Sequence, residues 1–313
     1  MRLSSTITAL QSRRRSALPV YILAAALFLG LVTTTPGFSN PANLINIVNQ
    51  QVALACATFG QAFVILTGGL DLSVGSVVSM TTAILSLDLP PLVVTLLAIV
   101  AALTVGCANA AGILWLRIHP VLMTLGTMTI VQGVALLLRP TPGGTAPAYL
   151  VSFSQTRIGA IPLPVFFLIA VAILFYLVLS RSRFGLHVLA AGGSAESAAL
   201  GGVNVRQIVA GCYVLSSAMA GVAGFVLSGR IASGDPLIGA NFAFDSVAAA
   251  ALGGTLLAGG LGTVGGCLAG VGLLALLYNG LNFWNVSGYY QMLIKGGLLI
   301  LAVSAQRRSE PGL

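Results

Sequence analysis

Two acidic residues stand within the most apolar parts of this sequence. Asp71 lies in "GGLDLSVGS" (68–76), with long hydrophobic runs on both sides, and Asp245 lies in "FAFDSVA" (242–248). A carboxylate is expensive to hold in hydrocarbon, so such a residue marks a site of function by default. Because a proton relay normally uses several intramembrane acids, two candidates give little support for proton-coupled transport.

Polar side chains in other apolar runs extend the set of candidates for a translocation path or its gate. The set is Asp71, Ser73, Asp245, Asn279, Asn282 and Gln291. Each amide, like Asn109, could equally form a hydrogen bond between helices, which is the commoner role of such a residue. Asp71 also precedes an apolar run as a helix cap does. We therefore expect its carboxylate to accept backbone N–H groups at the start of the next helix and to contact Ser73.

Several motifs that mark enzymes are missing from the sequence. It contains no GxxxxGK[ST] motif, no GxSxG motif and no pair of buried carboxylates within one helical turn. His119 and His187 are far apart, with no carboxylate at the spacing of a metal site, and the four cysteines form no CxxC pair. We predict no catalytic residue, no metal, no cofactor and no ATPase site in this chain.

The composition predicts a protein whose solvent is lipid. Of the 313 residues, 57% are hydrophobic and only 6% are charged, whereas a soluble domain carries roughly 25% charged residues. The apolar runs are long and continuous, which favours helices over the short alternating strands of a barrel. The net charge of +8 does not indicate nucleic-acid binding, because the arginines fall mostly between apolar runs, where they set topology.

Ten apolar runs are each close to the roughly 20 residues that cross a bilayer. The fold class predicted is an all-α, polytopic membrane protein with about ten transmembrane helices. Its parts are a tail at 1–17, a single transmembrane domain at 18–305 and a tail at 306–313. The predicted helices are 18–35, 43–66, 70–87, 91–114, 120–138, 163–180, 207–230, 243–259, 263–280 and 288–305.

The arginines orient these helices. With both termini in the cytoplasm, the cytoplasmic segments hold Arg2, Arg13, Arg14, Arg15, Arg117, Arg181, Arg183, Arg206, Arg307 and Arg308. The outer segments then hold only Arg139, Arg157 and Arg230, with Asp88 and Asp235. This excess on the inside agrees with the positive-inside rule. The basic run before the first helix could belong to a signal peptide, but no clear cleavage site follows, which favours an uncleaved helix.

The cytoplasmic loop 181–206 is long and contains helix signals. Its centre, "SAESAAL" (194–200), has good helix formers after Ser194 and is bracketed by the pairs Gly192–Gly193 and Gly201–Gly202. We predict a short helix across the cytoplasmic mouth that docks a partner, with an ordinary connector as the alternative.

Glycine is abundant, with 38 residues in the chain. Small residues three and four apart in 252–272 predict close helix packing, and we assign the remaining glycines to helix breaks. The segments "GGLDLSVG" and "GGLGTVG" (259–265) resemble each other, which is weak evidence for an internal repeat.

Several stretches together resemble the ribose-type ABC sugar permeases of bacteria. They occur in the order and at the spacing of that family, from about residue 40 to 305. The stretches are "ILTGGLDLSVGSVVS" (65–79), "HPVLMTLGTMTIVQGVAL" (119–136), "FGLHVLAAGGSAESAALGGVNV" (184–205), "FDSVAAAALGGTLLAGGLGTVGG" (244–266) and "NGLNFWNVSGYYQMLIKGGLLILAV" (279–303).

The resemblance implies a subunit of the bacterial inner membrane that imports a monosaccharide. Its implied partners are a separate ABC ATPase, a periplasmic sugar-binding protein, a second permease chain and membrane lipid. A coupling helix at 192–203 would dock on the ATPase. The coupling residues implied are Gly193, Glu196, Ala199, Gly201 and Asn204.

The sequence departs from the family at two places. Ala243 stands where members often carry a glutamate, and the usual acidic residue after the last span is absent. These departures put the contacts at the outer mouth in doubt, but not the fold. A permease for a nucleoside, autoinducer-2 or a branched-chain amino acid stays open within the class. Outside it, an ion-coupled secondary transporter and a non-transporting scaffold stay open.

Overall fold

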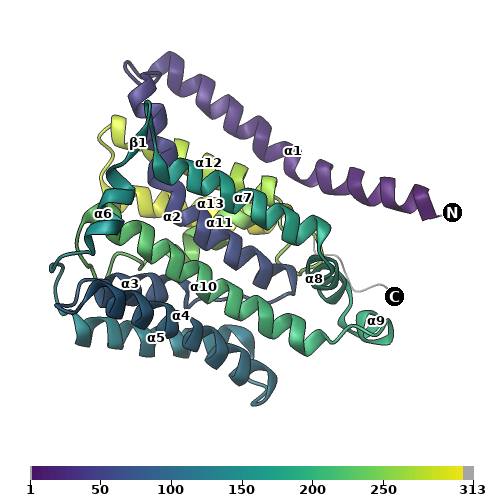
Figure 1. Cartoon of the computed structure of the whole chain (residues 1–313). Coiled ribbons are helices and arrows are strands. Elements are labelled where there is room, and N and C mark those ends of the chain that lie inside the picture. The colour runs from purple at the N-terminus through teal and green to yellow at the C-terminus, as the bar shows by residue number, and fades with distance from the viewer. Residues whose placement is uncertain (1, 306–313) are drawn as a thin grey trace.

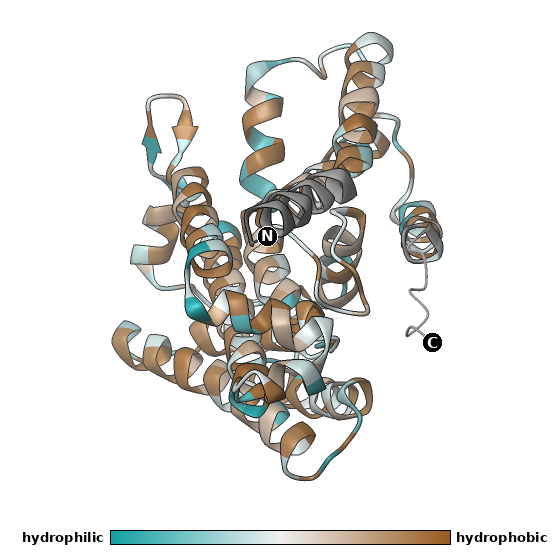
Figure 2. Cartoon of the chain, turned by 90° about the vertical axis from the view of Figure 1, so that its right-hand side faces the viewer, coloured by the Kyte–Doolittle hydropathy of each residue, from teal (hydrophilic) through white to brown (hydrophobic). Residues whose placement is uncertain are grey.

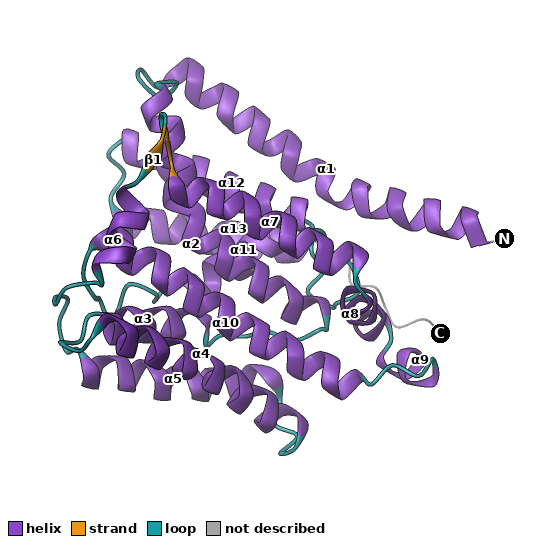
Figure 3. Cartoon of the chain, viewed as in Figure 1, coloured by secondary structure: helices purple, strands orange, loops and turns teal. Residues whose placement is uncertain are grey.

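Helices make up most of the computed structural model, which describes residues 2–305. Of residues 2–17, 302, 303 and 305 it describes the backbone alone. The elements are α1 (Arg2–Thr34), α2 (Pro41–Leu66), α3 (Val74–Leu85), α4 (Pro91–Leu114), α5 (Pro120–Leu138), α6 (Ala148–Gln155), β1 (Arg157–Ile158), β2 (Ile161–Pro162), α7 (Leu163–Arg181), α8 (Arg183–Gly193), α9 (Ala195–Leu200), α10 (Val205–Ile231), α11 (Phe242–Leu252), α12 (Val264–Phe283) and α13 (Gly288–Ala305). The two short strands form an antiparallel hairpin at the end of the bundle opposite α9 (Figure 3).

Five of the described helices are long and apolar enough to cross a bilayer, namely α4, α5, α7, α10 and α12. The outer sides of α4 and α5 expose large apolar side chains such as Leu92, Leu122 and Leu137, as helices in contact with lipid do. Figure 2 shows hydrophobic residues along the length of the long helices. The prediction of an all-α membrane protein is therefore confirmed.

Helix α1 begins earlier than the sequence predicts. The sequence predicts a helix over 18–35, whereas the observed helix runs from Arg2 to Thr34 and includes most of the segment 1–17. Its apolar part, Leu18–Thr34, matches the predicted first span. The preceding residues include Ala, Leu, Gln and Arg, which favour the helix and extend it beyond its apolar part. The predicted tail 306–313 lies outside the described residues.

Helices α2 and α10 form the centre of the bundle (Figure 1). Helix α10 packs against α2, α3, α4 and α6, and α2 also contacts α11 and α12. Every residue of α2 from Val52 to Leu66 is buried, as is every residue of α3. Polar residues on these helices therefore face protein and not lipid, which lowers their cost in the membrane.

Two of the predicted helices are only about two thirds as long as the sequence predicts. The predictions of full spans at 70–87 and 243–259 are wrong in length, because α3 has 12 residues and α11 has 11. At 1.5 Å per residue such helices cover only about 18 Å of a core roughly 30 Å thick. Each is joined to its neighbour by non-helical backbone, at 67–73 and 253–263. Glycines with positive φ lie in both segments, namely Gly68, Gly254, Gly259 and Gly260, and only glycine adopts this backbone freely.

Candidate functional site

Asp71 lies in the first helix break and is fully buried. Its Oδ1 accepts a hydrogen bond from the Ser73 backbone N–H at 3.0 Å and another from the Ser73 hydroxyl. Ser73 is the N-cap of α3, so the carboxylate supports the start of that helix from two residues upstream. This is the contact that the sequence predicts, although the N-cap position belongs to Ser73.

Side chains from three neighbouring helices fix the backbone around Asp71. Asn109 of α4 donates its Nδ2 to the Ser73 hydroxyl at 2.9 Å. When the Gln61 amide of α2 is oriented to satisfy both its polar atoms, it donates to the Asp71 carbonyl at 3.0 Å. In that orientation it also accepts from the Asp71 N–H at 3.2 Å. Thr124 of α5 donates to the Leu70 carbonyl at 3.3 Å. The non-helical backbone at this depth is thus satisfied by protein, as a membrane interior requires.

Helix α10 brings further polar side chains to the same place. A Cβ on Gly69 would overlap the Tyr213 hydroxyl, so the ring of this tyrosine lies directly against the break. Within the described residues, Asp71 Oδ2, Asn109 Oδ1, Tyr213 OH and Ser216 Oγ form no hydrogen bond. Buried polar groups are normally paired, so these open positions set the group apart, and we call it the Asp71 cluster.

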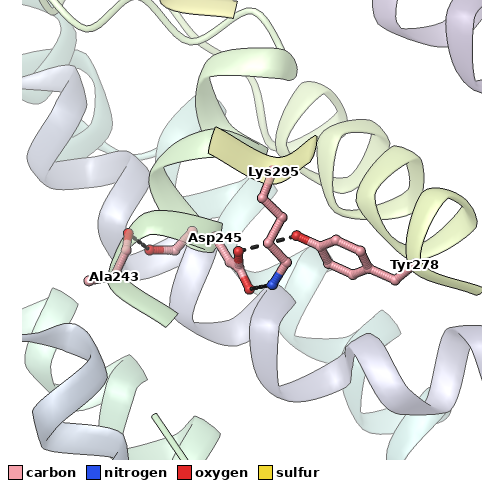
Figure 4. Close-up of polar contacts among 5 residues, drawn as sticks. Ala243, Asp245, Tyr278 and Lys295 are labelled. Carbon is pink, nitrogen blue, oxygen red and sulfur yellow. Dashed lines mark hydrogen bonds and ion pairs between the residues drawn. The ribbon is translucent and has the colours of Figure 1, made fainter. Parts of the chain in front are cut away.

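Asp245 belongs to a second group, at the meeting of α11, α12 and α13 (Figure 4). Its Oδ2 lies 3.0 Å from the Nζ of Lys295, and its Oδ1 accepts a hydrogen bond from Tyr278 at 3.2 Å. The Lys295 ammonium also lies 4.2 Å from the centre of the Tyr278 ring, a cation–π geometry. Ala243, which stands where the family often has a glutamate, is buried. We call Asp245, Tyr278 and Lys295 the Asp245 triad.

The predicted amides form hydrogen bonds between helices. Asn279 of α12 and Asn43 of α2 exchange hydrogen bonds of 3.1 and 3.2 Å. Gln291 of α13 donates to Asn282 at 2.8 Å and to the Val286 carbonyl at 2.9 Å. The predicted path residues thus fall into two groups. Asp71 and Ser73 lie in the break between α2 and α3, whereas Asp245, Asn279, Asn282 and Gln291 lie on α11, α12 and α13.

The predicted short helix in the loop 181–206 is confirmed. Helix α9 begins after Ser194, whose hydroxyl accepts the Ser197 N–H at 3.2 Å, and it ends at Gly201. Helix α8, which precedes α9, was not predicted, although Ser182 caps it by accepting the Gly185 N–H at 3.1 Å. A serine ahead of the apolar spacing in 184–191 was the signal that could have revealed α8.

The residues predicted to contact an ATPase lie on the exposed surface of this loop. Gly193, Glu196, Ala199, Gly201 and Asn204 are all exposed. Asn204 has a structural role as well, because its side chain caps α10 by accepting the Gln207 N–H at 3.2 Å. Leu200, which was not among the predicted coupling residues, is 85% exposed at the end of α9. A lone apolar residue before the glycine pair was the available signal.

The comparisons with known proteins agree with this architecture. Residues 43–303 match the family model described as branched-chain amino acid transport system / permease component. The chain belongs to this family. No solved structure matches it significantly.

Several sugar permeases align with this chain over most of its length. It is 34% identical to the ribose import permease protein RbsC of Escherichia coli (strain K12), over 92% of this chain and 93% of RbsC. It is 31% identical to the D-allose transport system permease protein AlsC of the same strain, over 85% and 83%. The galactose/methyl galactoside import permease protein MglC of Haemophilus influenzae is 30% identical, over 91% and 92%. The resemblance to sugar permeases is confirmed, and the chain is a multi-pass inner-membrane transport subunit.

Proposed function

We propose that this chain is the membrane-spanning subunit of a bacterial ABC importer that carries a monosaccharide, a ribose-like pentose or a hexose. The observation that carries this proposal is the agreement of full-length relatives named for ribose, D-allose and galactose or methyl galactoside, at 30–34% identity. The description of the matching family names branched-chain amino acid transport and not sugar transport. The relatives therefore decide the substrate class in favour of sugars over amino acids, nucleosides or autoinducer-2.

The proposed transporter draws its energy from a separate ATPase. The sequence has no GxxxxGK[ST] motif of its own. Helix α9 offers an exposed face with one acid, Glu196, and one large apolar residue, Leu200, on which such a subunit can dock. A periplasmic sugar-binding protein delivers the substrate, and a second permease chain completes the pore. The binding protein supplies specificity, so the permease needs no tight sugar site.

The proposed topology has about ten crossings with both termini in the cytoplasm. It counts α3 and α11 as crossings together with the non-helical segments beside them, as in discontinuous helices of other transporters. The start of α1 and helix α9 lie at the same end of the bundle (Figure 1), which supports a shared cytoplasmic side. The excess of arginine on that side supports it as well.

In the proposed cycle, ATP binding draws two ATPase subunits together and moves the docked α9 helices. The two permease chains then alternate between outward-facing and inward-facing states. Asp71, Ser73 and the Asp245 triad, with Asn279, Asn282 and Gln291, are proposed to line or gate the path. Their sparse polar atoms favour weak, transient contacts with a sugar, which suit a conduit better than a tight site does.

A pull-down in mild detergent tests the ABC assignment. A nucleotide-binding ATPase is expected to co-purify with the tagged native chain and to be lost from the Glu196→Arg, Gly201→Trp variant. Uptake of labelled pentoses and hexoses by cells that lack and regain the chain then tests the substrate class. A native chain that stays folded without retaining an ATPase, and whose uptake collapses with the ion gradient, would instead support a secondary transporter.

A further inference from the structure

Three separate segments of backbone meet where α8 ends. The carbonyl of Leu66, the last residue of α2, accepts a hydrogen bond from the Gly260 N–H at 2.9 Å. Gly192, near the end of α8, lies against both partners. A Cβ at position 192 would overlap the Leu66 carbonyl oxygen and would lie 2.6 Å from the Gly260 nitrogen. Only a glycine can occupy this position without moving one of the other two segments.

Each of the three segments contributes glycine to this contact. A Cβ on Gly259 would lie 2.9 Å from the Gly68 nitrogen and 3.0 Å from the Gly192 carbonyl oxygen. Gly68, Gly259 and Gly260 all have positive φ, between 78° and 95°. We call Leu66, Gly68, Gly192, Gly259 and Gly260 the glycine junction. Its contacts run from backbone to backbone, so no rotation of a side chain can absorb a movement of one segment.

The junction lies between the exposed helix α9 and both interrupted helices. A single residue, Ser194, separates α8 from α9, and its backbone forms a hydrogen bond with each of these helices. Its N–H reaches the Ala190 carbonyl at 3.1 Å, and its carbonyl accepts the Ala198 N–H at 2.9 Å. On the other side, Leu66 leads into the segment that holds Asp71, and Gly260 lies in the segment between α11 and α12. A displacement of α9 therefore reaches both helix breaks through a short, stiff path.

We propose that Gly192 is a positioning residue that transmits the movement of α9 to the two helix breaks at once. This inference rests on the proposed function, in which α9 docks on an ATPase. Through the first break the movement reaches the Asp71 cluster. Through the second it reaches α11, which carries Asp245. The two groups of path residues, which lie on different helices, are thereby driven by one contact.

A matched pair of variants tests this role. Gly192→Ala inserts a methyl group into the junction, whereas Gly133→Ala in α5 is the control, because a Cβ there meets no atom within 4 Å. Both positions lie inside helices, so the change in helix propensity is shared. With the ATPase and binding protein reconstituted in vesicles, we expect Gly192→Ala to keep ATPase binding and hydrolysis but to transport about tenfold less sugar per ATP. Gly133→Ala is expected to match the wild type. Equal transport by the two variants would overturn the inference.

Hydrogen–deuterium exchange on the wild-type complex tests the same role without any variant. Binding of a non-hydrolysable ATP analogue is expected to change exchange in 67–73 and in 253–263 together. A change in neither segment, or in one alone, would overturn the role of the junction even if Gly192→Ala fails to fold. A wild-type complex without ATP-driven uptake would instead overturn the proposed function, and the inference with it.

Discussion

Asp71 is buried without a cationic side chain among the contacts described for it, and it depends on hydrogen bonds. Removing the carboxylate leaves the Ser73 N–H and hydroxyl without their acceptor. We expect Asp71→Ala to lower the free energy of unfolding by about 1–3 kcal/mol and to reduce uptake while assembly persists. Asp71→Asn retains an acceptor and is expected to lose less stability. Thermal unfolding in detergent and sugar uptake measure the two effects, and wild-type uptake by Asp71→Ala would contradict the prediction.

Lys295 is the only lysine of the chain, and it is paired with Asp245. The ion pair is partly buried, with side chains 23% and 14% exposed. Breaking such a pair from one side leaves a charge in a poorly solvated place. We expect Lys295→Met alone to destabilise the protein by about 1–3 kcal/mol, and the double variant Lys295→Met, Asp245→Asn to be less destabilised. A double-mutant cycle measures the coupling, and additive effects would show that the pair contributes nothing.

At the scale of elements, helix α9 is short and depends on its cap. A helix of six residues gains little from its own hydrogen bonds, so the Ser194 hydroxyl is important for it. We expect Ser194→Ala to cost about 1 kcal/mol locally and to weaken co-purification of the ATPase. Ser194→Asp, which can also accept from the helix N-terminus, is expected to preserve it. Equal binding by both variants would mean that docking itself orders α9.

The long helices are predictable from the sequence, and the interrupted ones are not. Apolar runs with proline or capping residues at their starts place α2, α4, α5, α7, α10 and α12 within a few residues of their observed ends. The same apolar criterion extends 70–87 and 243–259 beyond α3 and α11. Hydropathy does not show where the backbone leaves the helix. The glycines at 68 and 259–260 occur both in the interior of membrane helices and in turns, and the contacts with neighbouring segments decide between the two.

The hydrogen-bond partners of the polar residues are likewise only partly predictable from the sequence. The contact between Asp71 and Ser73 follows from their spacing in the sequence. The pairing of Asn43 with Asn279, 236 positions apart, and of Asp245 with Lys295, 50 positions apart, does not. Such contacts depend on which helices become neighbours, and composition alone carries no information about that.

At the scale of the whole molecule, the orientation in the membrane can be measured directly. In a background without the four native cysteines, we expect Glu196→Cys to react with a membrane-impermeant thiol reagent only in inverted vesicles. Arg157→Cys, in the hairpin at the opposite end of the bundle, is expected to react in intact cells from which the outer membrane has been removed. Labelling of both positions from the same side would contradict the proposed topology.

The shortness of α3 also has a consequence for biosynthesis. A segment of 12 residues is too short to be inserted as a span by itself, and it carries Ser76, Ser79, Thr81 and Thr82, all of which are buried in the finished protein. Helix α10, which covers α3, ends at Ile231. At bacterial elongation rates, roughly 10–30 s pass between completion of α3 and completion of α10. During that interval the nascent chain holds a polar half-helix without its cover, so a ribosome stalled in this window leaves an intermediate that membrane proteases can recognise.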